Sequence, residues 1–415
     1  MSIELTDEQK ELKRRIIHWY NNFPHGKPYY YYSGAAGTGK TTVMQSIVND
    51  LGLRFNQYIT CAYTGKAVLV LLRKGLPSQT LHSLIYDVRT SNSYDIELDE
   101  WGNPHKVKKC KTGFVLKDHI SKDIKLIFLD ERAMVNDKML NDLQSFGVPI
   151  IMAGDQNQLP PVFGTASDLD CPDFVLTQIM RQEQDNPIVY LSQCVLNDMP
   201  IQYGQYKMSN VVKSVNIDKN VIDNYDIILC PKNKTRDNIN DIIRNDVLGY
   251  EERKPVIGDK VICRRNNRDE ELDGIYLTNG LVGTLTDVNY CSMHRDVIYA
   301  NFKPDFMEEQ FEKLSLDYKY LRSDYSFRKE YDYDWNSDNK LNLFEYAYAI
   351  TVHLSQGSEY SRVLFMDEKY GGGEMLKRLR YTAITRARDM ITWVKQEDKK
   401  RSFYTYYGNT YNLND

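Results

Sequence analysis

Apolar residues along the chain gather in short runs, and several of these runs end in a polar or glycine-rich segment. Residues 28–33 form an aromatic run that favours a strand, and a glycine-rich segment and a helical pattern follow it. Residues 125–129 and 148–153 are continuous apolar runs, as expected for strands buried on both faces in a parallel sheet. Residues 226–233 and 362–367 form two more such runs much further along the chain. The pattern predicts alternating strands and helices, and therefore an α/β fold built from two units.

The segment 85–119 departs from this pattern, because its apolar and polar positions alternate. Tyr94, Ile96 and Leu98 are separated by acidic residues, a turn follows at Trp101, and the return arm is rich in lysine. An acidic arm that faces a basic arm favours antiparallel pairing, so we expect a protruding β-hairpin. Trp101 stands near its tip, where an aromatic ring can stack on a partner. The alternative is a surface hairpin with this tryptophan packed at its base.

A second segment, residues 281–341, begins with two strand-like stretches and continues through an acidic, tyrosine-rich tract. It fits neither α/β unit, so we expect a small β insert there. The chain has 415 residues, which is too long for one ordinary domain. The expected division is a first lobe at 1–84 and 120–190, a hairpin at 85–119, a second lobe at 191–280 and 342–415, and the β insert at 281–341.

The glycine-rich segment after the first strand has the G-x-x-x-x-G-K-[ST] spacing of a phosphate-binding loop. Glycines let the backbone wrap so that its N–H groups point at phosphate oxygens, and the helix N-terminus adds its dipole. Lys40 supplies a compact positive charge for the β and γ phosphates, and the Thr41 hydroxyl is placed to ligate Mg²⁺. We therefore expect ATP and Mg²⁺ as cofactors. The nucleotide-binding residues of this loop are Gly34, Ala35, Ala36, Gly37, Thr38, Gly39, Lys40, Thr41 and Thr42.

Two polar groups follow the next buried strands. Asp130, at the end of one strand, is expected to hold Mg²⁺ through water, and the adjacent Glu131 is expected to polarise the attacking water. Gln158, just beyond the strand at 148–153, can touch both the γ-phosphate and that water. An Asp-Glu pair alone is also found on solvated surfaces, and Gly154 to Val162 is also typical of a turn-rich loop. Their position behind buried strands favours ATP hydrolysis.

Charge and cysteine usage limit the other classes. The formal net charge is −4, so any nucleic-acid binding must use a local track. The seven cysteines form no C-x-x-C pair, which argues against a zinc ribbon or a disulfide framework. Charged residues near the N-terminus and the short apolar runs predict neither a signal peptide nor a membrane span. We expect a cytoplasmic protein that acts as a monomer without a membrane partner.

The ordered series of motifs resembles superfamily 1 helicases, and within them the RecD-like and Dda-like branch of the phage or bacterial type. The resemblance implies a bacterial or phage-infected host cell. The phosphate loop, the Asp-Glu pair and the segment GDQNQLPPV match closely, and the other motifs follow in the family's order. The remaining matching segments are Leu5 to Gln9, Thr60 to Ala67, Thr80 to His82, Met180 to Gln182, Val352 to Glu359 and Tyr381 to Ala387.

The resemblance implies two RecA-like lobes with ATP between them, an SH3-like β insert, and a hairpin that splits duplex DNA. It implies a 5′–3′ motor on single-stranded DNA, active at duplex junctions and acting with replication, repair or recombination proteins. Gln9 would read adenine, Arg181 and Arg386 would reach the γ-phosphate, and Gly357 and Glu359 would line the nucleotide. The implied DNA contacts are Thr64, Lys66, Thr80, His82, Trp101, Pro160, Asn233, His353 and Ser355.

Two departures from the family pattern affect the link between the ATP site and the DNA track, and one contact with DNA phosphate. Arg132 and Ala133 stand where a small residue and a serine are usual, and Leu354 replaces a common lysine. Three alternatives remain: an RNA-directed or 3′–5′ helicase, a P-loop ATPase that remodels proteins, and a nucleotide-binding protein that does not hydrolyse ATP. Stimulation of ATP turnover by DNA distinguishes among these classes.

Overall fold

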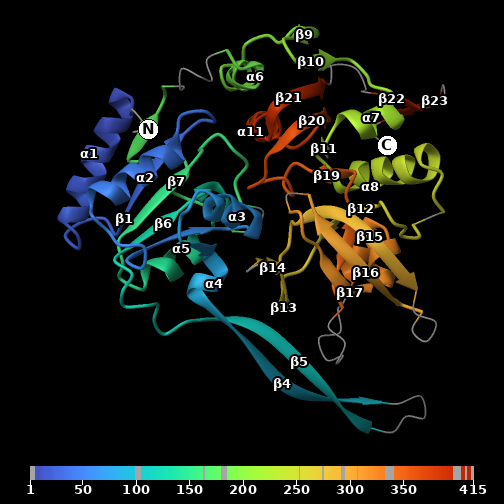
Figure 1. Ribbon diagram of the computed structural model, residues 1–415, viewed down its shortest axis with the longest axis horizontal. Coiled ribbons are helices and arrows are strands. Elements are labelled where there is room, and N and C mark those ends of the chain that lie inside the picture. The colour runs from blue at the N-terminus through green and yellow to red at the C-terminus, as the bar shows by residue number, and fades with distance from the viewer. Residues whose placement is uncertain are drawn as a thin grey trace.

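A computed structural model of the chain has two α/β lobes that face each other, an all-β body beneath the second lobe, and a long hairpin that leaves the first lobe (Figure 1). The α/β class expected from the sequence is confirmed by its two mainly parallel sheets. No helix in the described ranges is long and apolar enough to cross a membrane. The structure describes residues 5–98, 104–161, 164–178, 185–251, 253–272, 275–290, 295–305, 307–331, 341–395, 403–406 and 409–412.

The first lobe is built on a sheet with the strand order β3-β2-β6-β7-β1-β8. Its central strands β6 and β7 are buried along their whole length, which explains why their sequences are continuously apolar. Parallel pairing of β1 with β7 and of β6 with β7 brings their carboxyl ends to one edge, where the polar segments follow. The strands are β1 (Tyr29–Gly34), β2 (Tyr58–Ala62), β3 (Ser78–Thr80), β6 (Leu126–Leu129), β7 (Ile150–Gly154) and β8 (Phe174–Leu176). The helices are α1 (Asp7–Asn21), α2 (Lys40–Asp50), α3 (Gly65–Arg73), α4 (Leu81–Ile85), η1 (Arg132–Met134) and α5 (Asp137–Gln144).

The second lobe repeats this plan with the strand order β19-β11-β20-β21-β10-β9. The expected boundary near residue 190 is wrong, because it cuts through α6 (Pro187–Leu196). This helix packs on α11 (Gly373–Ile384), and Ile188, Leu191 and Val195 belong to the core of the second lobe. The strands are β9 (Gly204–Tyr206), β10 (Ser209–Val212), β11 (Ile227–Cys230), β19 (Ala349–Thr351), β20 (Tyr360–Met366) and β21 (Ala387–Val394). The other helices are α7 (Lys219–Asn224), α8 (Asn233–Asp241) and the π-helix η3 (Ile242–Val247).

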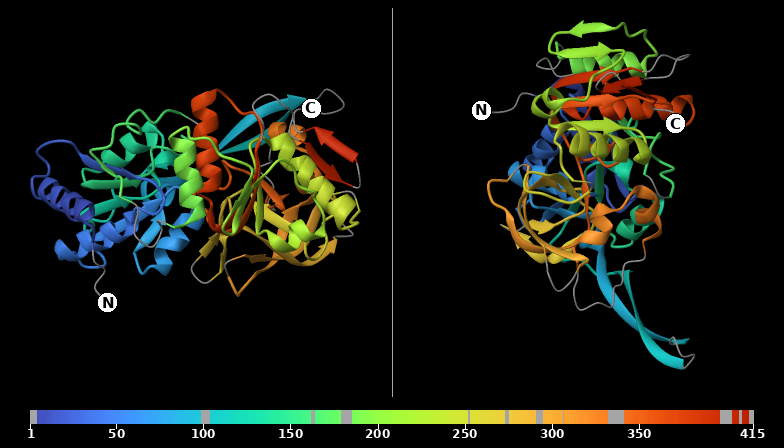
Figure 2. Two further views of the ribbon diagram at one scale, coloured as in Figure 1. Left: turned by 90° about the horizontal axis from the view of Figure 1, so that it is seen from above. Right: turned by 90° about the vertical axis from the view of Figure 1, so that its right-hand side faces the viewer.

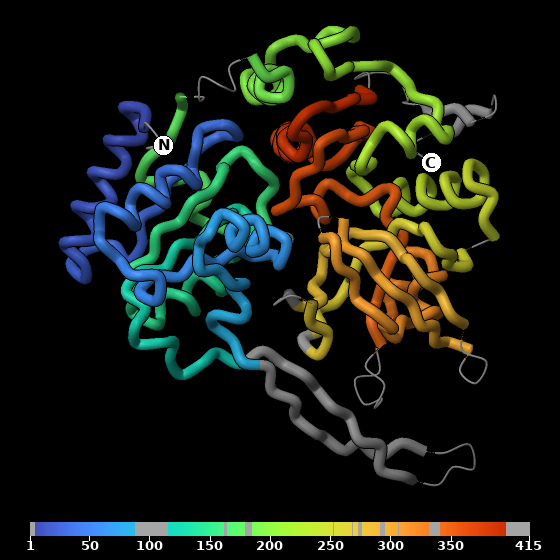
Figure 3. The backbone as a smooth tube through the Cα atoms, in the orientation of Figure 1, coloured from blue at the N-terminus to red at the C-terminus, as the bar shows by residue number. Residues whose placement is uncertain are grey.

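The all-β body has the antiparallel order β17-β16-β15-β12-β18, and Figure 3 follows the chain into it from the second lobe and back again. The expected bounds of 281 and 341 are too narrow, because β12 and β18 both lie outside them. These strands pair with each other across more than 80 residues of sequence. The elements are β12 (Lys260–Cys263), β13 (Asn267–Leu272), β14 (Ile275–Leu277), β15 (Val282–Tyr290), β16 (Val297–Pro304), β17 (Phe311–Asp317), α9 (Tyr318–Arg322), α10 (Tyr325–Glu330) and β18 (Phe344–Tyr346).

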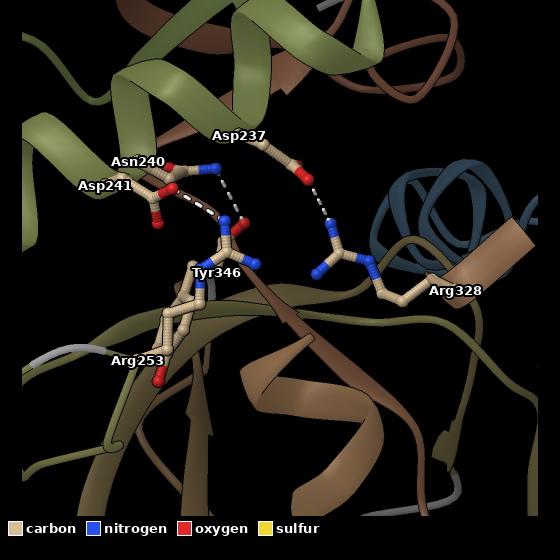
Figure 4. A pocket seen from close by; sticks show the side chains of 6 residues that line it. All are labelled: Asp237, Asn240, Asp241, Arg253, Arg328 and Tyr346. Atoms are coloured by element: carbon tan, nitrogen blue, oxygen red, sulfur yellow. Dashed lines mark hydrogen bonds and ion pairs between the residues drawn. The ribbon is translucent and has the colours of Figure 1, made fainter. Parts of the chain in front are cut away.

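A cluster of charges fastens the second lobe to this body, and Figure 4 shows two of its ion pairs, Arg328 with Asp237 and Arg253 with Asp241. Arg236 of α8 lies 2.8 Å from the Glu345 carboxylate, and Arg328 of α10 lies 2.7 Å from Asp237. Burial would raise the pKa of Glu345, but Arg264, Arg236 and Arg328 outweigh it and lower that pKa to about 2. The carboxylate is therefore ionised and paired, so the cluster is a structural joint.

The hairpin consists of β4 (Tyr86–Leu98) and β5 (Pro104–Leu116), paired from Tyr86↔Leu116 to Leu98↔Pro104. Its register places Asp95 opposite Val107 and Glu97 opposite His105. The antiparallel hairpin expected from the sequence is therefore present, and the expected pairing of its charges stays a prediction. Trp101 lies outside the described residues. Two further strands, β22 (Phe403–Tyr406) and β23 (Asn409–Asn412), form an antiparallel pair after the second lobe.

Candidate ATP site and nucleic-acid track

The phosphate loop joins β1 to α2 through two glycines in the left-handed region. Gly37 has φ of 80° and Gly39 has φ of 75°, so both positions require glycine. A Cβ at Gly34 would lie 2.5 Å from the Thr38 hydroxyl oxygen, so the loop also leaves no room for a side chain there. These constraints explain the spacing of glycines in the sequence.

Lys40 and Gln9 both donate hydrogen bonds to this loop. Lys40 Nζ donates to the carbonyl oxygens of Gly34 (2.7 Å) and Ala35 (3.2 Å), so its charge lies over the loop. Gln9 is buried, and its Nε2 donates to the Thr38 carbonyl at 2.9 Å. The Gln9 Oε1 accepts from the Thr6 backbone N–H in a capping box at the start of α1. In this arrangement Gln9 ties α1 to the phosphate loop.

Asp130 and Glu131 stand at the carboxyl end of β6, as the sequence predicts. Glu131 has φ of 56°, a left-handed backbone that is uncommon for a residue with a side chain, and its N–H donates to the Asp130 carboxylate at 3.0 Å. Burial raises the pKa of Glu131, while Arg386 opposes this effect. Burial also raises the pKa of Asp130, against the opposing charge of Lys40. A carboxylate with a raised pKa is better suited to accept a proton near neutral pH.

Gln158 lies beyond β7 with 5% of its surface exposed, and its Oε1 has no hydrogen-bond partner among the described residues. A buried acceptor without a donor is matched by a water molecule, which can donate to it. The preceding turn is closed by Asp155, whose carbonyl accepts the Gln158 N–H and whose carboxylate accepts the Asn157 N–H. We refer to residues 155–161 as the sensor loop.

Arg386 comes from the second lobe, just after α11. It is 4% exposed, with Nη1 3.1 Å from the Ser358 carbonyl oxygen and Nε 3.3 Å from that of Thr382. Its charge acts on Glu131 of the first lobe. Gly357, with φ of 71°, meets the first lobe directly, since a Cβ there would lie 2.6 Å from the Thr64 hydroxyl oxygen. We call this contact between the lobes the seam, and Glu359 is exposed beside it.

Four hydrogen bonds connect α11 and the Ser355–Gly357 turn to the sensor loop and the phosphate loop. In Figure 2, α11 lies between the two sheets. Thr382 Oγ1 accepts the Leu159 N–H at 2.9 Å, and Gln356 Nε2 donates to the Leu159 carbonyl at 2.9 Å. The Tyr381 hydroxyl donates to the Asp155 carboxylate and also accepts the Ala36 N–H at 3.3 Å. The sensor loop is therefore held from both lobes.

The donors placed for Mg²⁺ are the Thr41 hydroxyl, on the first turn of α2, and the Asp130 carboxylate. Both are oxygen ligands, and two protein ligands leave positions for water and phosphate oxygens, as Mg²⁺ requires. Lys40 acts electrostatically on Asp130, which places the carboxylate on the phosphate side of the site. The residues fit the ion.

The DNA-contact candidates of the first lobe include two residues that cap helices and one that packs between aromatic rings. The Thr64 hydroxyl caps α3 and the Thr80 hydroxyl caps α4. His82 lies between Tyr63 and Tyr86, with ring centroids 5.4 and 5.8 Å away. Burial lowers the pKa of His82, so the imidazole is neutral near pH 7. Pro160 is half-buried in the sensor loop.

Lys66 faces the second lobe rather than the solvent. Its Nζ lies 4.2 Å from the centre of the Tyr360 ring, and burial lowers its pKa to about 8. A DNA contact by Lys66 would require the seam to open.

The candidates of the second lobe differ in their accessibility. Asn233 begins α8, and His353 lies 5.7 Å from the Tyr370 ring, with its pKa also lowered by burial. Ser355 is fully buried and its hydroxyl donates to the Val352 carbonyl at 2.7 Å, so here it holds the turn. Leu354 packs against the core of the second lobe. Arg181 and Trp101 lie outside the described residues.

The structure explains one departure from the family pattern. Arg132 is fully buried, donates to the carbonyl of Val135 and pairs with Asp168. The segment that follows the sensor loop is thereby fastened behind Glu131, in place of a serine hydroxyl contact.

Tyr63, Tyr370 and Tyr381 were not predicted from the sequence. Tyr63 and Tyr381 stand within motifs and Tyr370 lies between two of them, but the role of each depends on which ring or loop lies opposite. Only the position of Tyr381, at the start of the last motif, gave a signal that could have singled it out.

Comparisons with known proteins support this geometry. The AAA domain family matches residues 4–216, which is more than half of the chain, and the UvrD-like helicase C-terminal domain family matches residues 346–391. The ATP-dependent RecD2 DNA helicase of Deinococcus radiodurans is 23% identical over 86% of this chain and 45% of its own length. An uncharacterized protein of Methanocaldococcus jannaschii is 22% identical over 90% of this chain and 37% of its own. The chain thus spans less than half the length of these curated relatives.

Solved structures share the fold. The Pif1 helicase from Bacteroides in complex with ADP-AlF3 and single-stranded DNA has a TM-score of 0.52 at 17% identity, covering 94% of this chain and 92% of that one. A structure described as DNA unwinding at forked duplex DNA by two coordinating Pif1 helicases has a TM-score of 0.53 at 19% identity, covering 95% and 92%. The matched families and the shared two-lobe fold identify the chain as a member of superfamily 1, in the group of helicases that includes RecD and Pif1.

Proposed function

We propose that this chain is an ATP-dependent DNA helicase that moves 5′–3′ along single-stranded DNA and unwinds duplex DNA ahead of it. The observation that carries the proposal is the contact between the lobes: Tyr381 bonds Ala36 and Asp155, and Thr382 bonds Leu159. These bonds bring Arg386 of the same segment close enough for its charge to act on Glu131. Because the carboxylate and the guanidinium come from different lobes, ATP hydrolysis requires the lobes to be together, and product release permits them to part.

In this mechanism Lys40 and the loop N–H groups bind the phosphates, and Gln158 and Glu131 orient and deprotonate the attacking water. Arg386 stabilises the charge that develops on the transferred phosphoryl group. Mg²⁺ held by Thr41 and Asp130 would neutralise phosphate charge. Each closure changes the distance between the DNA contacts on the two lobes. The contacts of one lobe thereby move along the DNA strand relative to those of the other.

The proposed DNA track runs over helix starts of both lobes. The N-termini of α3 (Thr64, Gly65) and α8 (Asn233) lie at the carboxyl ends of β2 and β11, and helix N-termini favour phosphate. His82 and His353 are neutral, so they would act by hydrogen bonding or stacking and add little to the dependence on salt. Contacts of this kind hold the backbone and the base faces, so we expect weak sequence preference.

The DNA substrate rests on the relatives, and the polarity rests on the resemblance of the motifs to the RecD-like and Dda-like branch. RecD2 is an ATP-dependent DNA helicase by name, and Pif1 has been solved bound to single-stranded DNA. The first experiment is steady-state ATP hydrolysis with no nucleic acid, with single-stranded DNA, and with single-stranded RNA of equal length. Stimulation by DNA alone supports the proposal. Equal stimulation by RNA would mean that DNA is not the specific substrate of the motor. Without stimulation by either, the helicase proposal would be overturned.

Unwinding and polarity need duplex substrates. A duplex with a 5′ single-stranded tail should be unwound, and one with a 3′ tail should not; the reverse result would reverse the polarity. Trp101→Ala should keep DNA-stimulated ATP hydrolysis while slowing unwinding, since stacking on a base contributes about 1–3 kcal/mol. Equal losses in both assays would exclude a role for Trp101 in strand separation.

A further inference from the structure

Tyr381 joins three parts of the ATP site through one hydroxyl group. The residue is fully buried on α11, five positions before Arg386. Its hydroxyl accepts the N–H of Ala36 in the phosphate loop and donates to the carboxylate of Asp155 at the start of the sensor loop. A movement of α11 is therefore felt at both loops of the first lobe.

Asp155 extends this connection toward the reacting groups. Its other carboxylate oxygen accepts the Asn157 N–H at 3.0 Å, which shapes the turn that presents Gln158. Its charge also acts on Glu131. Burial and the neighbouring Asp155 hold the pKa of Tyr381 well above its ordinary value, so the hydroxyl keeps its proton and remains a donor.

We propose that Tyr381 is a positioning residue for ATP hydrolysis. Its hydroxyl fixes the phosphate loop and the sensor loop against α11, so that Gln158 and Arg386 reach the γ-phosphate in one arrangement. The inference rests on the proposed function, because it assigns the residue to the hydrolysis step of that motor.

A tyrosine at this position could also serve only as a filler of the seam, and the chain offers a matched control. Tyr360 is likewise a tyrosine of the second lobe at the seam, 7% exposed, with its ring beneath Lys66. Its hydroxyl is not bonded to the first lobe among the described residues, and the group that acts on it most closely is Ser358 of its own lobe. Tyr→Phe at either position removes one oxygen and keeps the ring, so the two variants differ mainly in the bonds made to the first lobe.

The experiment compares Tyr381→Phe and Tyr360→Phe with the unaltered chain in kcat and KM for ATP, with and without single-stranded DNA, and in thermal unfolding. Tyr381→Phe should lower kcat about tenfold or more, as expected for the loss of a hydrogen bond to a charged group, and change KM less than about threefold. Tyr360→Phe should stay within about twofold. Asp155→Asn should reproduce the loss, and the double variant Tyr381→Phe, Asp155→Asn should lose little more than either single one.

The outcomes separate this inference from the helicase proposal. Equal kcat values for Tyr381→Phe and Tyr360→Phe would overturn it, as would a loss explained by unfolding alone. If DNA fails to stimulate the unaltered chain while Tyr381→Phe still lowers basal kcat, the helicase proposal fails and the positioning role stands. If DNA stimulates and Tyr381→Phe behaves like the unaltered chain, only the positioning role fails. A chain without any ATP hydrolysis would overturn both.

Discussion

The two lobes carry the same pair of residues at corresponding strand ends, with opposite surroundings. Asp130 and Glu131 follow β6 in the first lobe, and Asp367 and Glu368 follow β20 in the second. In the second lobe the pair is enclosed by its own domain. Arg380 Nε donates to Asp367 at 2.9 Å. Glu368 accepts from Thr235 Oγ1 at 2.7 Å and pairs with Lys232 Nζ at 3.0 Å.

The first pair instead receives its positive charges from the phosphate loop and from across the seam. Lys40 acts on Asp130, and Arg386 of the other lobe acts on Glu131. An Asp-Glu pair behind a buried strand is thus structural where cations of the same lobe neutralise it. It becomes a candidate for catalysis where its partner arrives only on closure. The predictions below test this difference, from the largest expected effect to the smallest.

The largest effect should separate Glu131→Gln from Glu368→Gln. Loss of the general base should lower kcat for ATP by about 10²–10⁴-fold in Glu131→Gln. Glu368→Gln should keep kcat within about threefold and lower the free energy of unfolding by about 1–3 kcal/mol, because a buried acceptor of charged and hydroxyl donors is weakened. Steady-state kinetics and urea unfolding of both variants measure this, and comparable kcat losses would erase the distinction between the pairs.

The two arginines that accompany the pairs should separate in the same way. Arg386→Ala should lower kcat about 10³-fold, as for other arginines that stabilise phosphoryl transfer. Arg380→Ala removes one partner of Asp367, which also accepts a hydrogen bond from Trp393 Nε1. It should leave kcat within about threefold while the protein becomes less stable. Single-turnover hydrolysis at saturating ATP makes the comparison. A hydrolysis rate in Arg386→Ala close to that of the unaltered chain would remove Arg386 from the site.

The residues that follow the pairs provide a third contrast. Arg132 is fully buried and paired with Asp168, whereas Lys369 is exposed. Arg132→Met should destabilise the protein by about 3 kcal/mol, because Asp168 is left as a poorly solvated charge. Lys369→Met should change stability by less than about 0.5 kcal/mol. Chemical denaturation provides the values, and adding Asp168→Leu to Arg132→Met should recover part of the loss if the unpaired charge is its cause.

The smallest effect concerns pH and Lys66, which faces a ring where Lys232 faces a carboxylate. The pKa of Lys66 is lowered to about 8, first by burial, so between pH 8 and its ordinary value of 10.5 the unfolded chain binds more protons than the folded one. Stability from this group should therefore rise with pH above about 8. Lys66→Met should flatten that rise in unfolding measurements at pH 7.0 to 9.5. An unchanged slope in the variant would assign the rise to other groups.

The sequence predicted the α/β class, the phosphate loop and the position of Asp130 and Glu131, because these depend on local spacing and on buried strands. It could not predict the limits of the β body, since β12 and β18 pair across a long stretch of chain. It also could not predict the exact register of the hairpin, where a shift of one residue exchanges the faces of a strand. The role of Tyr381 depends on Asp155, which is distant in sequence and belongs to the other lobe.

The seam includes a contact that has no side chain on one side. Gly357 meets Thr64 through its backbone alone. A glycine has no rotamers to lose, so this contact costs no side-chain entropy when the lobes come together and returns none when they part. If the lobes open and close once per ATP, the contact is remade identically in every cycle. It would act as a mechanical stop that fixes how far each stroke can travel.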